Sequence, residues 1–158
     1  MTKQESSSES VTGNASIKFI IKGAYYGDKC FPGLNDLLHE AERHPKAYND
    51  MKRRFQKIAI DAIRRDLRGV KTKGRVFPIY KFYEPSKGQI RDYDNIQSAA
   101  RKIINDALVK TQTIKDDKPQ YLLFGMNEFY YTKDVPKIEV HLVEVEYAQE
   151  KISNISRK

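Results

Sequence analysis

A long amphipathic segment at residues 47–67 limits the folds open to this 158-residue chain more than any other feature. Its apolar side chains recur every three or four positions: Tyr48, Met51, Phe55, Ile58, Ala59, Ala62, Ile63 and Leu67. That spacing predicts a helix about 30 Å long with one apolar face, which ends at Gly69. Because such a face has to be buried, we expect this helix to cover another layer of structure.

A second helix and four strands complete the predicted fold. Apolar residues spaced like those of the first helix predict a helix over residues 95–110. Alternating or β-branched patterns predict strands at residues 16–22, 75–83, 120–131 and 136–147. We expect residues 24–46 to form a loop with one or two turns of helix. The order β-α-β-α-β-β predicts an α+β fold, with a small mixed β-sheet covered by two main helices.

Two irregularities are expected in these strands. Pro78 lacks a backbone N–H, which favours an edge position or a bulge for its strand. The apolar alternation up to Leu142 continues out of phase from Val143, which predicts a bulge near Leu142.

The composition indicates one soluble domain. We expect a disordered Ser-rich tail at residues 1–14, a single domain at 15–150 and a flexible C-terminus at 151–158. The apolar runs are far shorter than the roughly 20 residues that cross a bilayer, so we expect no membrane partner. The polar start of the chain predicts a cytoplasmic protein, and Cys30 has no second cysteine to pair with.

Positive charge predicts a polyanionic partner. The chain has 29 Lys and Arg against 21 Asp and Glu, a net charge of +8. Between Arg43 and Arg75 twelve basic and three acidic residues give +9. We expect basic side chains at the end of the first long helix and just after it to contact a DNA backbone: Arg64, Arg65, Arg68, Lys71 and Lys73. The alternative is an ordinary solvated helix face.

Aspartates are concentrated around the second long helix. Asp92 and Asp94 lie two apart just before it, so an extended chain would direct both carboxylates the same way. Such a pair favours a hard divalent cation such as Mg²⁺, and Asp117 from the following loop would add a third ligand. The alternative is structural: Asp94 as the N-cap with Gln97 at the third helical position, and Asp116-Asp117 as a polar turn.

Lys102 and Asp106 lie one helical turn apart beside the apolar stripe. They form either an exposed ion pair or, with the ammonium of Lys102 directed at a phosphate, part of a site near the aspartates.

The ordered set Arg91-Asp92-x-Asp94-Asn95, Lys102-x-x-x-Asp106-Ala107-Leu108 and Asp116-Asp117 resembles the RusA-type Holliday junction resolvases. The resemblance covers residues 91–117 and implies a RusA-like nuclease fold. It implies that the matching Asp92, Asp94 and Asp117 bind Mg²⁺, or Mn²⁺ as a substitute, with Asp116 beside them. In the same way Arg91 and Lys102 match the basic partners, and the family works as a homodimer on four-way DNA junctions.

The chain departs from the family pattern in one spacing. Four extra residues separate Asp94 from the Lys102 segment, and Ser98 stands at the lysine spacing of the prototype. One added turn keeps Lys102 on nearly the same helix face but about 6 Å further along.

These features predict a Mg²⁺-dependent endonuclease that resolves four-way junctions in DNA recombination and repair, with Asp92, Asp94, Asp117 and Lys102 as catalytic residues. Two alternatives stay open. One is a flap or other branched-DNA nuclease with the same metal site, and the other is a non-catalytic basic DNA-binding module.

Overall fold

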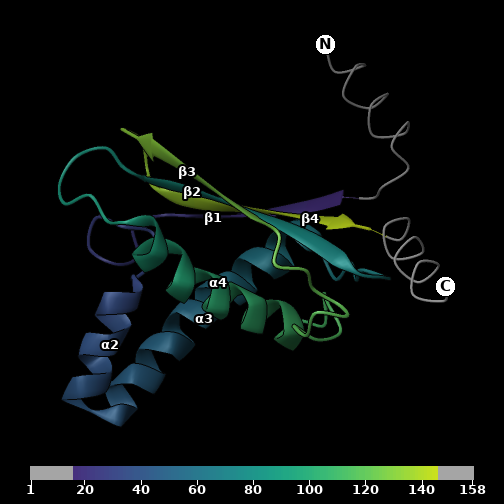
Figure 1. Ribbon diagram of the computed structural model, residues 1–158, viewed down its shortest axis with the longest axis horizontal. Coiled ribbons are helices and arrows are strands. Elements are labelled where there is room, and N and C mark those ends of the chain that lie inside the picture. The colour runs from purple at the N-terminus through teal and green to yellow at the C-terminus, as the bar shows by residue number, and fades with distance from the viewer. Residues whose placement is uncertain (1–15, 146–158) are drawn as a thin grey trace, which may run out of the picture.

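Three helices lie on one side of a four-stranded sheet in the computed structural model of the protein, which describes residues 16–145 (Figure 1). The elements in chain order are β1 (Ser16–Lys22), α2 (Leu34–Arg43), α3 (Pro45–Leu67), β2 (Val76–Pro85), α4 (Tyr93–Lys110), β3 (Met126–Thr132) and β4 (Lys137–Glu144). Helices α3 and α4 pack on the sheet, and α2 packs on those two helices. The strand order is β1-β4-β2-β3, with β4 antiparallel to both neighbours and β3 parallel to β2. The predicted α+β class with a mixed sheet is confirmed, and the expected bounds of β1 are correct.

The described residues contain three helices where two main helices were expected. Helix α2 has ten residues, so the prediction of one or two turns was wrong. The Asp36 carboxylate accepts a hydrogen bond from the Gly33 N–H at 2.8 Å, which satisfies one of the free amides at the start of the helix. Pro45 then begins α3 at once, since the first position of a helix needs no backbone donor.

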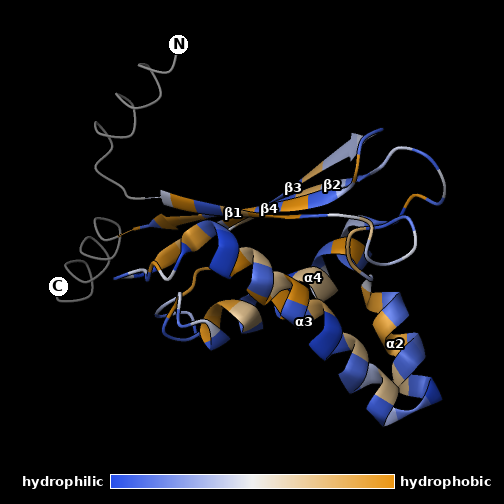
Figure 2. Cartoon of the chain, turned by 180° about the vertical axis from the view of Figure 1, so that it is seen from behind, coloured by the Kyte–Doolittle hydropathy of each residue, from blue (hydrophilic) through white to orange (hydrophobic). Residues whose placement is uncertain are grey.

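One side of β1, β2 and β4 faces the helices and forms a continuous core with them, while β3 adds only the partly buried Phe129. The strands contribute Phe19, Ile21, Val76, Tyr80, Phe82, Ile138, Val140 and Leu142. Helices α3 and α4 contribute Phe55, Ala59, Ala62, Ile63, Ile96, Ala100, Ile103, Ile104, Ala107 and Leu108. Hydrophilic residues occur on α3 both at the end joined to α2 and at the end near β1 (Figure 2), and the basic residues Arg53, Arg54, Lys57, Arg64, Arg65 and Arg68 are exposed. Burial of the apolar stripe therefore presents the basic side chains outward, as expected.

The end of α3 protects the outer edge of β1. Asp66 accepts the Ile20 N–H at 2.8 Å, and Arg65 donates to the Ile20 carbonyl at 2.6 Å. Arg65 and Asp66 also pair with each other at 2.9 Å, and this hydrogen bond is the main reason that the pKa of Asp66 is lowered. Two backbone groups that would otherwise pair with another strand are thereby satisfied.

Strand β3 is shorter than predicted. Residues 120–125 of the predicted strand run beside the start of β2 with a single bridge between Val76 and Leu122. Gly125 then changes the direction of the chain with a φ of 76°. A Cβ atom at Gly125 would lie 2.0 Å from the Pro78 carbonyl oxygen, so this close approach requires glycine.

Strand β2 is central in the sheet, but Pro78 has a paired strand on one side only, so the expected edge position holds locally and the alternative of a bulge was wrong. Pro78 pairs in register with Leu142 of β4, while the pairing of β2 with β3 begins only at Ile79. The proline therefore occupies the part of β2 where β3 has not yet joined.

Strand β4 keeps one unbroken register with both neighbours, so the predicted bulge near Leu142 was also wrong. Val143 simply points to the uncovered face of the sheet, opposite Phe77. The out-of-phase apolar residue reflects an apolar contact on that second face.

The predicted tail at 1–14, the C-terminus at 151–158 and residues 146–147 of the last predicted strand lie outside the described residues. Within the described part of the chain, none of the helices has the length and apolar character that a membrane span requires.

Replacing Gly125 with alanine should destabilise the fold by about 3 kcal/mol or more, because the new methyl group displaces backbone in a central strand. Gly69→Ala is the matched control, since Gly69 also has a positive φ, of 83°, but has open space at its Cβ position. The control should cost about 1–2 kcal/mol. Equilibrium urea unfolding measures both, and equal losses would contradict the role assigned to the Pro78 contact.

Candidate functional site

The start of α4 carries the first two motif aspartates. Asp92 is the N-cap, and its Oδ1 accepts a hydrogen bond from the Asn95 N–H at 2.7 Å. The helix therefore begins two residues before the predicted start, and the prediction of Asp94 as N-cap was wrong. Asp94 lies exposed in the first turn, where its charge complements the helix dipole. Asn95 accepts the Asn35 N–H at 2.8 Å and so joins α4 to α2.

The other motif aspartates lie at the far end of α4. Lys102 Nζ is 3.2 Å from Asp106 Oδ1 and 4.0 Å from Asp117 Oδ2. Asp116 accepts the Asp117 N–H at 2.7 Å, an arrangement typical of a polar turn. The ammonium of Lys102 thus lies between a carboxylate of α4 and one of the following segment.

The expected Mg²⁺ ligands do not gather in one place. Carboxylate oxygens are the right donors for this ion. However, the rise of α4 separates Asp94 from Asp106 by about 18 Å along the helix axis, and Asp117 lies near Asp106. Among residues 16–145, no three His, Cys, Asp or Glu side chains are placed together to hold a metal ion. Asp92, Asp94 and Asp117 therefore do not fit a single Mg²⁺ ion in this arrangement.

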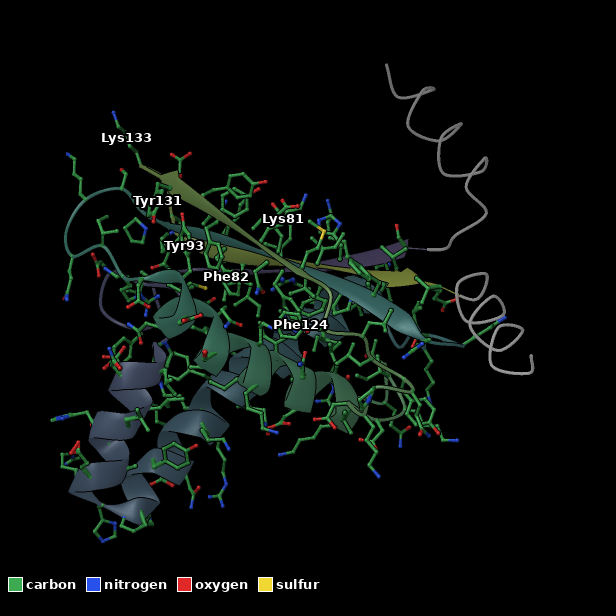
Figure 3. The ribbon with its side chains drawn as sticks, in the orientation of Figure 1. Lys81, Phe82, Tyr93, Phe124, Tyr131 and Lys133 are labelled. Carbon is green, nitrogen blue, oxygen red and sulfur yellow. The ribbon has the colours of Figure 1, made fainter. Side chains whose placement is uncertain are left out.

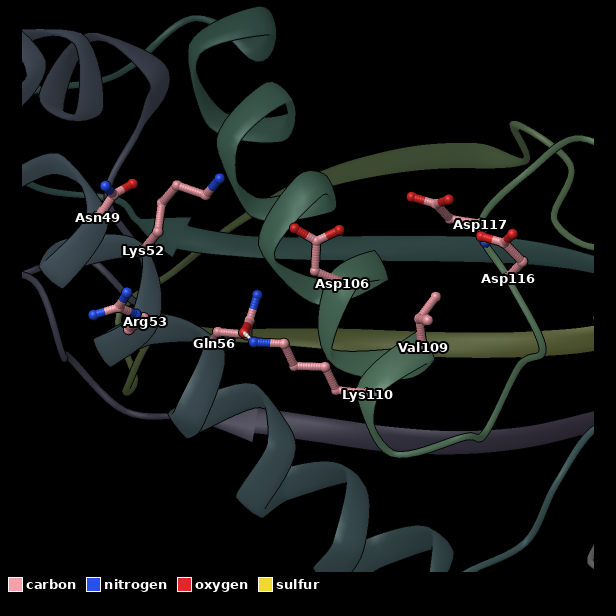
Figure 4. Close-up of a pocket in the computed structure, with 9 residues that line it drawn as sticks. All are labelled: Asn49, Lys52, Arg53, Gln56, Asp106, Val109, Lys110, Asp116 and Asp117. Carbon is pink, nitrogen blue, oxygen red and sulfur yellow. Dashed lines mark hydrogen bonds between the residues drawn. The ribbon is translucent and has the colours of Figure 1, made fainter. Parts of the chain in front are cut away.

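A pocket of about 400 Å³ lies between α3, α4 and the segment after α4 (Figure 4). It is lined by Asn49, Lys52, Arg53, Gln56, Asp106, Val109, Lys110, Asp116 and Asp117. Lysine and arginine side chains of α3 form one wall, and aspartates form the opposite wall. Gln56 is buried and accepts a hydrogen bond from Lys110, which ties the two helices together below the pocket. We call this the α3–α4 pocket.

Sequence reasoning did not assign Lys52, Arg53 or Asp106 to the site. Lys52 and Arg53 look like any exposed basic residues of the helix, and the sequence does not say what faces them. The sequence does give an indication for Asp106, because its spacing of four residues from Lys102 predicts the ion pair that the structure shows.

Arg91 has a structural position. Its side chain is 7% exposed and makes a two-pronged ion pair with the equally buried Glu84, at 3.0 and 2.8 Å. It also donates to the Phe31 carbonyl at 3.1 Å. In this conformation three of the five N–H donors of the guanidinium are engaged, and the side chain is enclosed by the segment before α2 and by β2 instead of facing a DNA phosphate at the surface.

The other residues predicted to contact DNA differ in whether their side chains already have partners within the protein. Arg65 holds the β1 edge, Arg68 ends α3 in a left-handed conformation with a φ of 52°, and Lys71 donates to Gln112 at 3.1 Å. Arg64 is exposed, and its side chain makes no hydrogen bond or ion pair with the other described residues. Lys73 is exposed, and its backbone N–H donates to Glu144. The structure brings none of these five residues to the α3–α4 pocket.

A scan of the chain against protein-family models found no match, and a search of curated proteins found none either. Support for a function therefore comes from the sequence motif and from the geometry described above.

Arg91→Ala should destabilise the protein by about 3–5 kcal/mol, because it leaves the Glu84 carboxylate buried without a partner. Arg43→Ala is the control, since Arg43 pairs with Glu40 at 3.1 Å but is 64% exposed. That loss should stay below about 1 kcal/mol. Urea unfolding distinguishes the two, and a small effect at Arg91 would return this residue to the set of candidate DNA contacts.

Proposed function

We propose that the protein is an endonuclease that cuts branched DNA, with four-way junctions as the preferred substrate. The observation that carries this proposal is the α3–α4 pocket, where the basic helix meets the aspartates of the motif. The motif resemblance supports the same reaction. We include a requirement for Mg²⁺, or Mn²⁺ in its place, because the motif is rich in carboxylates. The positions of these carboxylates in the described part of the chain do not form a coordination site for one ion.

The chemistry of the pocket suits a phosphodiester. Lys52 and Arg53 would neutralise and orient a phosphate, since their side chains come from the outward face of α3. Lys102 lies within reach of Asp106 and Asp117, so its ammonium would stabilise charge that develops on the phosphate oxygens. An aspartate carboxylate of the opposite wall would accept a proton from the attacking water.

The preference for four-way junctions in this proposal is based on their two-fold symmetry. A four-way junction has two equivalent strands to cut, which a homodimer would cut in a paired manner. A flap or other branched substrate requires only one such site, so a flap nuclease with the same pocket is the nearest alternative.

A second candidate function is a DNA-binding module without catalysis. The specific observation in its favour is that the aspartates already have structural partners: Asp92 caps α4, and Asp106 lies 3.2 Å from Lys102. A protein of this kind would bind DNA through α3 and leave it intact.

The test is cleavage of synthetic DNA by the full chain. We expect cuts in a four-way junction with Mg²⁺, weaker cuts in a flap, none in a linear duplex, and no cuts in any DNA with EDTA. Flap cleavage without junction cleavage would favour the alternative nuclease. Binding to all three DNAs without cleavage, in Mg²⁺ or Mn²⁺, would favour the non-catalytic module.

Lys102→Ala should slow single-turnover cleavage tenfold or more, about 1.4 kcal/mol of transition-state stabilisation, with little change in junction affinity. Ser98→Ala is the matched control, since Ser98 lies one turn earlier on nearly the same face of α4 and should have almost no effect. The reverse result would mean that the helix is aligned with the family one turn out of place.

A further inference from the structure

Aromatic rings form a stack along the outer strand β3. Tyr93, at the start of α4, lies parallel to Phe129 of β3 with 4.1 Å between ring centroids and 18° between planes. Phe129 in turn stacks on Phe82 of the neighbouring strand at 5.3 Å and 17°. Figure 3 shows Tyr93 and Tyr131 together near one end of β3, with Lys133 beyond them. One face of the Tyr93 ring is therefore supported by the ring of Phe129.

A second supported ring lies near the other end of β3. The guanidinium of Arg101 is buried between the ring of Tyr80, at 4.3 Å, and the ring of Phe124, at 3.9 Å. Asn127 accepts from Arg101 at 3.0 Å and Phe124 accepts through its carbonyl, which fixes the guanidinium in place. One face of the Phe124 ring is thus covered by a held cation.

The same rings are open to solvent on their outer side. Phe124 is 68% exposed, Tyr93 57% and Tyr131 45%. Single exposed aromatic residues are common on protein surfaces. Three along one strand, two of them with one face packed against a fixed group, are typical of a surface that accepts another flat group.

We propose that Tyr93, Phe124 and Tyr131, here called the β3 aromatic edge, stack the unpaired bases of a nucleic-acid strand. This inference rests on the proposed function, since it assigns a place to bases that leave the duplex at a branch point. Every base has a flat face that stacks on an aromatic ring, whatever the sequence. One cation is available at the end of the edge, since Lys133 follows β3 directly.

The length and position of the edge agree with this occupant. The seven residues of β3 span about 20 Å, the length of about six stacked nucleotides. Phe124 contacts Arg101, and the next residue of α4, Lys102, lies 4.0 Å from Asp117 of the α3–α4 pocket. Helix α4 therefore contributes one side chain to the edge and the next one to the pair with Asp117.

The experiment measures the affinity of the full chain for a fluorescein-labelled twelve-residue oligothymidine by anisotropy, in EDTA and at fixed salt. Phe124→Ala and Tyr131→Ala should each raise Kd at least about fivefold. Tyr25→Ala is the matched control, since Tyr25 is 38% exposed and lies outside the edge, and it should change Kd less than twofold. The conservative variants Phe124→Tyr and Tyr131→Phe should keep the affinity of the original protein.

A second readout makes the stacking itself visible. An oligonucleotide with a central 2-aminopurine should lose fluorescence on binding to the original protein, and this quenching should be weaker with Tyr131→Leu, which keeps an apolar side chain. Thermal unfolding of each variant confirms that it folds. Unchanged Kd and unchanged quenching in folded variants would overturn the inference.

Three further outcomes are decisive. If the variants alter only self-association in sedimentation and leave Kd unchanged, the edge is a subunit interface and the inference is overturned. If the protein cuts no branched DNA yet the ring variants lose oligonucleotide affinity, the stacking surface stands and the nuclease proposal fails. If it cuts junctions and the ring variants bind normally, only the stacking inference fails.

Discussion

The burial of one face of α4 is the constraint on which the rest of this structure depends. Ile103, Ile104, Ala107 and Leu108 are fully buried between the sheet and α3. That packing fixes the rotation of the helix, and with it the direction of every other side chain on α4. Asp106 then lines the α3–α4 pocket and pairs with Lys102, while Arg101 faces β3 and supports the ring of Phe124.

The same helix explains why the predicted metal ligands are divided. With 18 residues, α4 is long enough to place Asp92 and Asp94 at one end and the segment of Asp116 and Asp117 near the other. The four extra residues relative to the family pattern amount to one turn. Lys102 lies between Asp106 and Asp117. In the described structure the ammonium of Lys102 therefore offsets the negative charge of Asp106 and Asp117.

Local patterns predicted the elements whose apolar spacing is regular. The alternation in residues 16–22 predicted β1 to the residue, and the stripe in α3 predicted its buried face. Helix α2 was underestimated because its start depends on one carboxylate, that of Asp36, that bonds back to Gly33. The start of α4 was misplaced because Asp92 and Asp94 are both good caps, and only the backbone conformation distinguishes them.

The charged residues were harder to predict because their roles depend on distant partners. Arg91 and Arg65 look alike in sequence, yet one is buried against Glu84 and the other holds the edge of β1. Lys52 and Arg53 become candidate site residues only because the fold places aspartates opposite them in the same pocket. A count of positive charges predicts a polyanionic partner, but it does not say which cations are free to meet it.

Amide NMR of the protein with an uncut four-way junction, in EDTA, tests most directly whether the α3–α4 pocket and its surroundings are the DNA-binding site. The account predicts that signal loss on adding the junction is greatest at residues 49–56, 102–117 and 124–132, and small in β1 and in the exposed part of α2. Signal loss centred on β1 and α2, with the pocket residues unaffected, would contradict the account.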